Sequence, residues 1–121
     1  MKALFDTNIL IDFLLGKIPA KKEISQFTEP SISIITWMEV LVGAKTDDEE
    51  KFLRNFLNEF KLLNTTPEVA NKAVQLRKEH RIKLPDAIIW ATALENNRLF
   101  VTRNTKDFPQ NNPSIRVPYQ I

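Results

Sequence analysis

The sequence predicts an α/β protein, a three-layer α/β/α sandwich whose central, mainly parallel sheet has four to five strands. Short apolar segments alternate along the chain with longer segments of helical periodicity, and this alternation is typical of a parallel sheet covered by helices. The chain has 121 residues, with seven prolines, two glycines and no low-complexity stretch. These features favour a single folded domain over residues 1–121 rather than a linker or a disordered segment.

The first third of the chain is predicted to form two strands and two helices. The apolar run 3–5 is typical of a buried strand, and 9–15 is typical of an apolar helix. Gly16 is expected to end that helix, because glycine readily adopts the left-handed conformation of a helix cap. Residues 20–27 favour a short second helix, and the β-branched residues at 32–35 favour a second strand.

The middle of the chain is predicted to contain two further helices and a strand. Thr36 and Glu39 have the spacing of a capping box, in which each side chain satisfies a free backbone N–H, so a helix to Ala44 is expected. Four acids at 47–50 favour the first turn of the next helix, where the helix dipole stabilises negative charge. Residues 61–64 are then expected to form a third strand.

The last part of the chain is predicted to contain two helices and two strands. A helix over 67–80 begins with proline, which needs no N–H donor at that position. Pro85 opens the next helix in the same way, and an asparagine pair at 96–97 ends it. Residues 99–102 and 115–117 are expected to complete the sheet.

The composition restricts the chemistry that this chain can perform. It contains no cysteine and a single histidine, His80. The first fact excludes disulfides and thiolate sites, and the second disfavours a histidine metal site or a Ser-His-Asp triad. An enzyme with this sequence must therefore use carboxylates. The formal net charge of +2 suits a polyanionic partner.

Two observations concern the location of the protein. Asp6 follows only five residues, which leaves no room for a signal peptide before the fold begins. No apolar run approaches the roughly 20 residues that are needed to span a membrane. We therefore expect a cytoplasmic protein that has no membrane partner.

Four acids fall at one edge of the predicted sheet. Asp6 follows the first strand, Glu39 lies just after the second, and Asp107 lies a few residues past the fourth. Asp86 stands in the first turn of the helix that Pro85 opens. Because ligands of parallel α/β sheets bind beyond the carboxyl ends of the strands, these four carboxylates are expected to share one crevice.

Each acid also has a purely structural interpretation. Asp6 can cap the first helix, Glu39 can complete a capping box, and Asp107 can form a turn before Pro109. The joint pattern favours a site, because clustered carboxylates repel one another unless a cation lies among them. An all-oxygen site suits Mg²⁺ or Mn²⁺. The chemistry natural to such a site is phosphodiester hydrolysis by a water that the metal activates.

Basic residues precede or flank two of these acids. We expect them to hold a nucleic-acid substrate, and a solvated surface is the alternative interpretation. The candidates are Arg77, Lys78, Arg81 and Lys83 before Asp86, and Arg103 and Lys106 beside Asp107.

With these residues in place, the chain resembles a PIN-domain ribonuclease, specifically the VapC-like toxin of a type II toxin–antitoxin system. The resembling blocks occur in family order at 4–8 (LFDTN), at Glu39, at 84–87 (LPDA) and at 101–108 (VTRNTKDF). The resemblance implies a PIN-like fold and a Mg²⁺- or Mn²⁺-dependent endoribonuclease that leaves a 5′-phosphate and a 3′-hydroxyl. It also implies a toxin that inhibits translation or growth when its antitoxin releases it.

The resemblance assigns roles to individual residues. The catalytic and metal-binding residues would be Asp6, Glu39, Asp86 and Asp107. The residues that support these acids by hydrogen bonds would be Thr7, Asn8, Thr102 and Asn104. Asn104 stands where some relatives carry another acid, so the occupancy of a second metal position stays open.

The resemblance also implies two protein partners, a second copy in a homodimer and a VapB-like antitoxin that packs along helices and blocks the site. A candidate for the antitoxin contact is the helix face that carries Phe52, Leu53, Phe56, Leu57 and Phe60. Core packing against the sheet is the alternative interpretation of this stripe. The apolar helix 9–15 allows the same two interpretations.

Three other classes of protein are compatible with parts of the pattern. A phospho-receiver domain needs an aspartate at the end of its central strand, and 61–65 offers none. A haloacid-dehalogenase-type phosphatase needs an acid at position 8, where this chain has asparagine. The third class is a catalytically inactive PIN-fold module that binds RNA or protein, and the presence of all four acids disfavours it.

Overall fold

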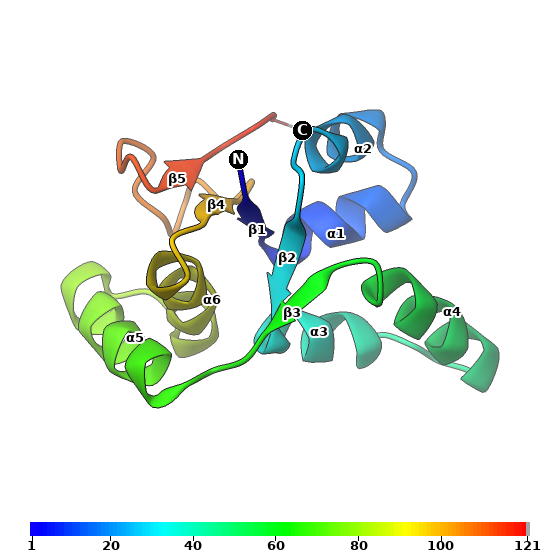
Figure 1. Ribbon diagram of the computed structural model, residues 1–121, viewed down its shortest axis with the longest axis horizontal. Coiled ribbons are helices and arrows are strands. Elements are labelled where there is room, and N and C mark those ends of the chain that lie inside the picture. The colour runs from blue at the N-terminus through cyan, green and yellow to red at the C-terminus, as the bar shows by residue number, and fades with distance from the viewer. Residues whose placement is uncertain (121) are drawn as a thin grey trace.

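The computed structural model describes residues 1–120 and shows the predicted alternation of strands and helices (Figure 1). The elements of this part of the chain are β1 (Ala3–Phe5), α1 (Thr7–Leu14), α2 (Ile18–Ser25), β2 (Pro30–Ser33), α3 (Ile34–Leu41), α4 (Asp47–Leu57), β3 (Lys61–Leu63), α5 (Pro67–His80), α6 (Leu84–Glu95), β4 (Leu99–Val101) and β5 (Ile115–Arg116). None of the helices within residues 1–120 is long and apolar enough to cross a membrane.

All strands of the sheet are parallel, and they lie in the order β3-β2-β1-β4-β5. Strand β1 is central, because Ala3 pairs with Pro30 of β2 on one side and with Leu99 of β4 on the other. The chain first builds outward from β1 through β2 and β3, and then returns to the other side of β1 with β4. This reversal creates a switch point at the carboxyl ends of β1 and β4, where parallel sheets bind their ligands.

Helices cover both faces of the sheet, which confirms the predicted three-layer sandwich. Helices α5 and α6 pack on one face, and α1 to α4 gather on the other (Figure 1). Leu4 and Phe100 point into the core beneath α5 and α6, whereas Phe5 and Val101 point into the opposite core. This alternation follows from the two-residue period of a strand. Trp90 of α6 is the largest of the fully buried side chains.

The second strand and the third helix begin earlier than predicted. Strand β2 starts two residues before the predicted segment 32–35, and α3 follows it directly. The cause is Ser33, whose hydroxyl accepts the Ile35 N–H at 3.0 Å and so caps the helix. The predicted capping box of Thr36 and Glu39 is therefore wrong, since both residues lie inside α3.

The other elements lie where they were predicted, with small shifts at their ends. Helix α1 begins directly after Asp6, because the Asp6 carboxylate caps it. Helix α6 begins at Leu84, so that Pro85 occupies the second helical position rather than the first. Gly16, with φ of 81°, and Asn97, with φ of 53°, adopt the left-handed conformations expected after α1 and α6.

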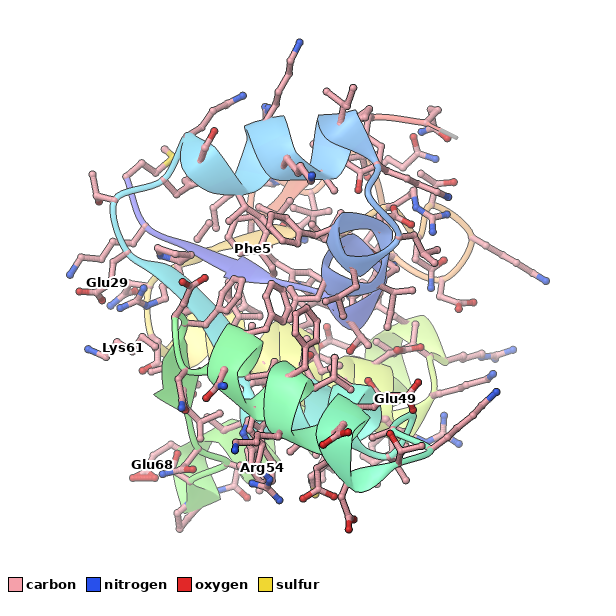
Figure 2. The ribbon with its side chains drawn as sticks, turned by 90° about the vertical axis from the view of Figure 1, so that its right-hand side faces the viewer. Phe5, Glu29, Glu49, Arg54, Lys61 and Glu68 are labelled. Atoms are coloured by element: carbon pink, nitrogen blue, oxygen red, sulfur yellow. The ribbon has the colours of Figure 1, made fainter. Side chains whose placement is uncertain are left out.

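Thr46 caps helix α4, and Glu49 of its first turn bonds back to the residue before the cap. The backbone N–H of Glu49 donates to Thr46 Oγ1 at 3.1 Å, and the Glu49 carboxylate accepts the Lys45 N–H at 2.6 Å. Figure 2 shows α4 across the front of the molecule, with Glu49 near one end and Arg54 farther along the helix. Glu49 thus stabilises the start of α4, as its position in the first turn predicts.

Ion pairs hold the edge of the sheet where the strands begin. Glu29 accepts a hydrogen bond from the Arg98 guanidinium, and its Oε1 lies 3.6 Å from Lys2 Nζ and from Lys61 Nζ. Arg98 is buried and also donates to Ser31 Oγ at 3.3 Å. Figure 2 shows Glu29 and Lys61 close together at this edge. These contacts connect the amino ends of four strands, β1, β2, β3 and β4. The opposite edge of the sheet therefore carries the carboxyl ends of the strands and the predicted acids.

Candidate active site

An open cleft lies at the carboxyl edge of the sheet, beside the switch point between β1 and β4. Its volume is about 460 Å³. Its lining comes from α1, α3, the start of α6 and the segments after β1 and β4: Asp6, Thr7, Asn8, Ile11, Glu39, Asp86, Arg103 and Asn104. Three of the four predicted acids therefore line one space. The fourth, Asp107, is outside this lining, but its charge acts on Asp86.

Asp6 is a buried acid of the cleft, with 4% of its surface exposed. Its Oδ1 accepts the Thr7 N–H at 2.8 Å, and this bond caps α1. Its Oδ2 accepts the Thr102 hydroxyl at 2.7 Å and the Asn8 side-chain amide at 3.3 Å. The structure thus gives Asp6 a capping role, and the same bonds fix the direction of its carboxylate.

The surroundings of Asp6 disfavour its negative charge. Burial raises the pKa of this carboxyl from 3.8 to about 6, although the hydrogen bonds from Thr102 and Thr7 oppose the rise. The charges of Asp86 and Glu39 add to it. Burial and neighbouring like charges both favour the protonated form of a carboxyl group. A cation in the cleft would therefore stabilise the ionised form of Asp6.

Asp86 stands in the first turn of α6, where Pro85 precedes it. The side chain is half-buried, and burial is the largest cause that raises its pKa. The charges of Asp107 and Glu39 raise it further, whereas Lys83 opposes the rise. Carboxylates from three separate segments of the chain thus act on one another at this cleft. Proline restricts φ at the start of the helix and so helps to set the position of Asp86.

Glu39 reaches the cleft from α3. Its Oε1 accepts the Thr7 hydroxyl at 2.6 Å, and Thr7 Oγ1 also lies 2.9 Å from Oγ1 of the buried Thr36. These bonds connect the first turn of α1 with α3. The sequence prediction gave Thr36 only a capping role, and a buried hydroxyl between two helices has no distinctive sequence signal.

The loop after β4 is organised by Asn104. Its side-chain oxygen accepts the N–H groups of Lys106 and Asp107, both at 3.1 Å, and its amide donates to Asp107 Oδ2 at 2.9 Å. The backbone N–H of Asn104 donates to Thr102 Oγ1 at 3.0 Å. The same threonine hydroxyl donates to Asp6. Asn104 and Thr102 therefore connect Asp107 with Asp6.

Arg103, which was predicted to bind RNA, forms an internal ion pair. Its Nε and Nη2 donate to the two oxygens of Asp12 at 2.7 and 3.1 Å. Asp12 is absent from the predicted site residues. The signal that could have identified it is its place as the single acid of the apolar helix 9–15, because a charged group in such a segment needs a partner when it is buried.

The other basic candidates lie around the connection between α5 and α6 and in the loop after β4. Arg77 donates to a backbone carbonyl of that connection, and Arg81 adopts the left-handed conformation that ends α5, with φ of 55°. Lys83 precedes α6. Burial raises the pKa of Asp86, and the charge of Lys83 opposes this rise. Lys106 and Lys78 are exposed. Lys83 and Lys106 thus stand next to the acids in sequence, whereas Arg77 has a structural contact.

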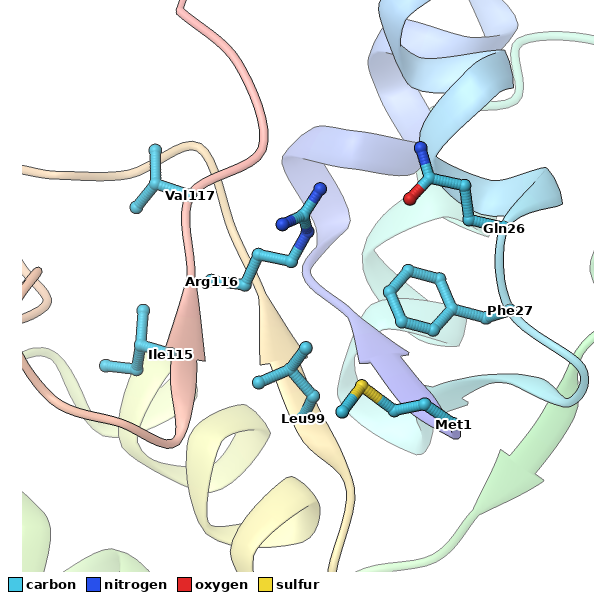
Figure 3. A pocket seen from close by; sticks show the side chains of 7 residues that line it. All are labelled: Met1, Gln26, Phe27, Leu99, Ile115, Arg116 and Val117. Carbon is cyan, nitrogen blue, oxygen red and sulfur yellow. The ribbon is translucent and has the colours of Figure 1, made fainter.

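A second, larger cleft of about 620 Å³ lies beside β4 and β5 (Figure 3). Its lining is apolar apart from two residues: Met1, Gln26, Phe27, Leu99, Ile115, Arg116 and Val117. The guanidinium of Arg116 donates to both oxygens of Glu23, at 2.6 and 3.0 Å. Its charge is thus balanced by a carboxylate, and three of the four acids predicted from the sequence line the other cleft.

The donor groups of the acidic cleft fit a hard divalent cation. Carboxylate, amide and hydroxyl oxygens are the ligands that Mg²⁺ and Mn²⁺ prefer, and the pKa values of Asp6 and Asp86 are both raised. Within residues 1–120, no three acids or histidines lie close enough together, as they are placed, to hold one metal ion. Repulsion between carboxylates favours such separation. The metal site therefore stays a prediction that rests on the chemistry of the donors.

The fold and the cleft define the class of the protein: a parallel α/β sandwich with a carboxylate site at the switch point of its sheet. A family model described as the PIN domain matches residues 3–112. The chain therefore belongs to the PIN-domain family, which confirms the family resemblance of its sequence.

Solved structures share this fold, and one of them is a toxin–antitoxin complex. A chain of a toxin–antitoxin complex from Klebsiella pneumoniae has 46% sequence identity and a TM-score of 0.92, with 99% of this chain and 100% of that chain covered. A chain of DNA-bound VapBC from Salmonella typhimurium has 23% identity and a TM-score of 0.77, with 96% of each chain covered. A chain of FitAcB from Neisseria gonorrhoeae has 21% identity and a TM-score of 0.78, with 98% of this chain and 99% of that chain covered. These last two show the fold alone. No curated protein sequence matches the chain significantly.

Proposed function

We propose that this protein is a Mg²⁺- or Mn²⁺-dependent endoribonuclease that hydrolyses phosphodiester bonds in RNA. The observation that carries the proposal is the convergence of Asp6, Glu39 and Asp86 on one cleft, with Asp107 acting electrostatically on Asp86. Membership of the PIN-domain family and the 46% identity with the Klebsiella pneumoniae chain support it.

Each group of the cleft has a role in this proposal. The residues that would hold the cation are Asp6, Glu39, Asp86 and Asp107. When bound, the cation supplies a water of lowered pKa and stabilises the charge that develops on the phosphate. Thr102 and Asn8 keep the Asp6 carboxylate in one orientation, and Thr7 does the same for Glu39. Such supporting hydrogen bonds set the direction and basicity of a metal ligand.

Basic side chains around the cleft are proposed to hold the RNA backbone. Lys83 and Lys106 each lie within three residues of a proposed metal ligand. Arg103 also lines the cleft, but its guanidinium is paired with Asp12, so Lys83 and Lys106 are the stronger candidates. Arg77 and Arg81 would extend this surface along the connection between α5 and α6. Contacts of this kind neutralise phosphates and position the substrate without reading its sequence.

We also propose that the protein is the toxin of a toxin–antitoxin pair, and that it inhibits translation or growth when a VapB-like antitoxin releases it. The Klebsiella pneumoniae structure is a toxin–antitoxin complex, and the VapBC and FitAcB structures share the fold. A homodimer belongs to the same proposal, because it follows from the VapC-like resemblance. A location in the cytoplasm, which was predicted from the sequence itself, is proposed with it.

A candidate surface for the antitoxin lies between α1, α4 and the loop that joins α3 to α4. It is a cleft of about 420 Å³, lined by Leu14, Gly43, Ala44, Asp48, Glu49, Phe52 and Leu53. In the predicted apolar stripe, Leu57 and Phe60 are buried core residues, whereas Phe52 is 64% exposed. The C-terminal end of the stripe thus packs in the core, whereas Phe52 at its N-terminal end is accessible to a partner. An apolar groove of this kind suits an amphipathic helix of a partner.

The Phe52→Ser variant is expected to bind the co-encoded antitoxin at least about tenfold more weakly than the wild-type protein, because aromatic anchors often contribute 2 kcal/mol or more to an interface. Its metal-dependent RNA cleavage in the absence of antitoxin should be unchanged. Calorimetric titration of each protein with the antitoxin measures the difference. The matched control is Val74→Ser, since Val74 is a 49% exposed residue of α5. Equal affinities for Phe52→Ser and the wild type would show that the antitoxin binds elsewhere.

The proposed activity is tested by incubating the purified protein, free of antitoxin, with total cellular RNA. We expect cleavage with Mg²⁺ or Mn²⁺, no cleavage with EDTA, and new ends that carry a 5′-phosphate and a 3′-hydroxyl. Cleavage that persists in EDTA would contradict the metal-dependent mechanism. A folded protein that cleaves none of the RNA species in the presence of either metal would contradict the nuclease assignment.

A further inference from the structure

Asp12 is a buried acid in the last turn of α1, with 1% of its surface exposed. Its carboxylate accepts two hydrogen bonds from the Arg103 guanidinium, at 2.7 and 3.1 Å, and one from the Tyr119 hydroxyl at 2.8 Å. The Nζ of Lys17 lies 3.6 Å from it. Burial alone raises the pKa of Asp12, but these contacts outweigh burial and lower the pKa below its ordinary value. Asp12 is therefore an ionised group inside the protein that the proposed catalytic machinery does not use.

Asn8 and Asp12 hold Arg103 from one face of α1. They lie four residues apart, so their side chains project from the same side of the helix. Asn8 Oδ1 accepts the backbone N–H of Arg103 at 3.3 Å, while Asp12 binds the guanidinium. Arg103 is thus attached to α1 through both its main chain and its side chain. A paired arginine–carboxylate contact is directional, so it fixes orientation as well as position.

The segment that is attached in this way carries contacts to two of the proposed metal ligands. Thr102, on one side of Arg103, donates to Asp6 Oδ2 at 2.7 Å. Asn104, on the other side, donates to Asp107 Oδ2 at 2.9 Å. Because Arg103 lies between these two residues, a displacement of its backbone changes the position of both. A continuous set of contacts therefore leads from Asp12 to Asp6 and Asp107.

We propose that Asp12 is a positioning residue, which through its paired bonds to Arg103 fixes the segment 102–107 and so sets the positions of Asp6 and Asp107. The proposal rests on the proposed function, since its consequences concern the binding of a divalent cation and the cleavage of RNA. Tyr119 joins this arrangement from the last part of the chain, because its hydroxyl donates to the same carboxylate. The C-terminal segment thus contributes to the support of the site.

A second ion pair provides a matched control for this proposal. Glu23 of α2 is 3% exposed, and it accepts two bonds from the Arg116 guanidinium, at 2.6 and 3.0 Å. The burial and the paired geometry resemble those of Asp12 and Arg103, but the pair joins α2 to β5 rather than α1 to the loop after β4. Asp12→Asn and Glu23→Gln therefore remove equivalent charges. The first releases the Arg103 side chain, whereas the second is expected to leave in place both the Arg103 contacts and the backbone bond from the Thr102 N–H to the Arg116 carbonyl, at 3.0 Å.

The experiment compares Asp12→Asn, Glu23→Gln and the wild-type protein, each as the full chain, below the melting temperature of the least stable variant. In Asp12→Asn we expect hydrogen exchange at the backbone amides of 103, 104 and 107 to become faster. Mn²⁺ binding, measured by calorimetry with the metal alone, should weaken by roughly 10–100-fold, as is typical when a group that supports a metal ligand is lost. The kcat for RNA cleavage should fall, with little change in KM. Glu23→Gln should lower only the melting temperature.

A double variant and a conservative variant sharpen the comparison. If Asp12 acts through Arg103, then Asp12→Asn combined with Arg103→Gln should lose no more Mn²⁺ affinity than Asp12→Asn alone. Arg103→Lys keeps the charge but cannot form the paired bonds, so it should show an intermediate loss, and it replaces Asp12→Asn if that variant fails to fold.

Two outcomes separate this proposal from the proposed function. If Asp12→Asn matches Glu23→Gln in amide exchange at 103–107 and in Mn²⁺ affinity, the positioning role is overturned, whatever the activity of the wild type. If the wild type neither binds Mn²⁺ nor cleaves RNA, the proposed function fails. Faster exchange of these amides in Asp12→Asn than in Glu23→Gln would then still support the role of Asp12 in fixing the segment.

Discussion

The Asp86→Asn variant is expected to cleave RNA at least about a hundredfold more slowly than the wild-type protein, because the loss of groups that merely support a metal ligand already costs about 10–100-fold. Asp86 is proposed to be a direct ligand. Asparagine keeps the shape of the side chain but removes its charge. The charge stands in a half-buried position beside other carboxylates, where burial and those carboxylates raise its pKa. Its removal should therefore leave the metal-free fold as stable as before or more so.

The measurement is the single-turnover rate of RNA cleavage at a fixed concentration of Mn²⁺, together with circular dichroism to show that each variant is folded. Asp47→Asn is the matched control, since Asp47 is an exposed acid in the first turn of α4 and should cleave at the wild-type rate. Undiminished cleavage by a pure and folded Asp86→Asn protein would remove Asp86 from the site.

The metal-free wild-type protein is expected to lose stability through Asp6 as the pH rises from about 4 to about 7. The pKa of Asp6 is about 6 in the folded protein, against 3.8 for an ordinary, exposed aspartate. Within this range the folded state therefore keeps the proton that the unfolded state has released. The stabilisation is complete below the unfolded pKa and is lost as the pH rises through the folded pKa. The rise in pKa corresponds to about 3 kcal/mol of unfolding free energy.

Urea unfolding in EDTA, at a series of pH values, measures this effect as a difference between the wild type and Asp6→Asn. The difference in unfolding free energy, wild type minus variant, should fall as the pH rises. Other titrating groups, including Asp12, are common to both proteins and cancel to first order in the comparison. A difference that stays constant, or that increases with pH, would show that burial and neighbouring charges do not raise the pKa of Asp6.

Much of the fold could be predicted because its signals are local. Alternating short apolar runs and amphipathic segments indicated the layers, and Pro67 at the start of α5 and Asn97 after α6 indicated helix ends. The error at α3 arose from a competition between two plausible caps. Ser33 and Thr36 can both begin a helix, and the choice depends on where β2 ends, which pairing with β1 and β3 decides. Pairing across the sheet is not visible in the residues of one segment.

The candidate site shows the same division between local and long-range information. The rule that ligands bind at the carboxyl ends of parallel strands was sufficient to predict that Asp6, Glu39 and Asp86 lie at one cleft. It could not show that Arg103 is paired with Asp12, because these residues lie 91 positions apart. A basic residue next to an acid in the sequence is naturally interpreted as a surface contact for RNA. Asp12 can be identified as the partner of Arg103 only from the folded structure, in which α1 packs against the loop after β4.

The central claim is that the acids of the cleft bind a divalent metal ion. The stabilisation of the folded protein by Mn²⁺ tests this claim most directly. At a concentration about 100 times the dissociation constant, a ligand that binds only the folded state contributes about 2.7 kcal/mol to the unfolding free energy. We predict that Mn²⁺ raises the melting temperature of the wild type clearly more than that of Asp6→Asn or Asp86→Asn. Equal shifts in the three proteins would contradict a metal site formed by these carboxylates.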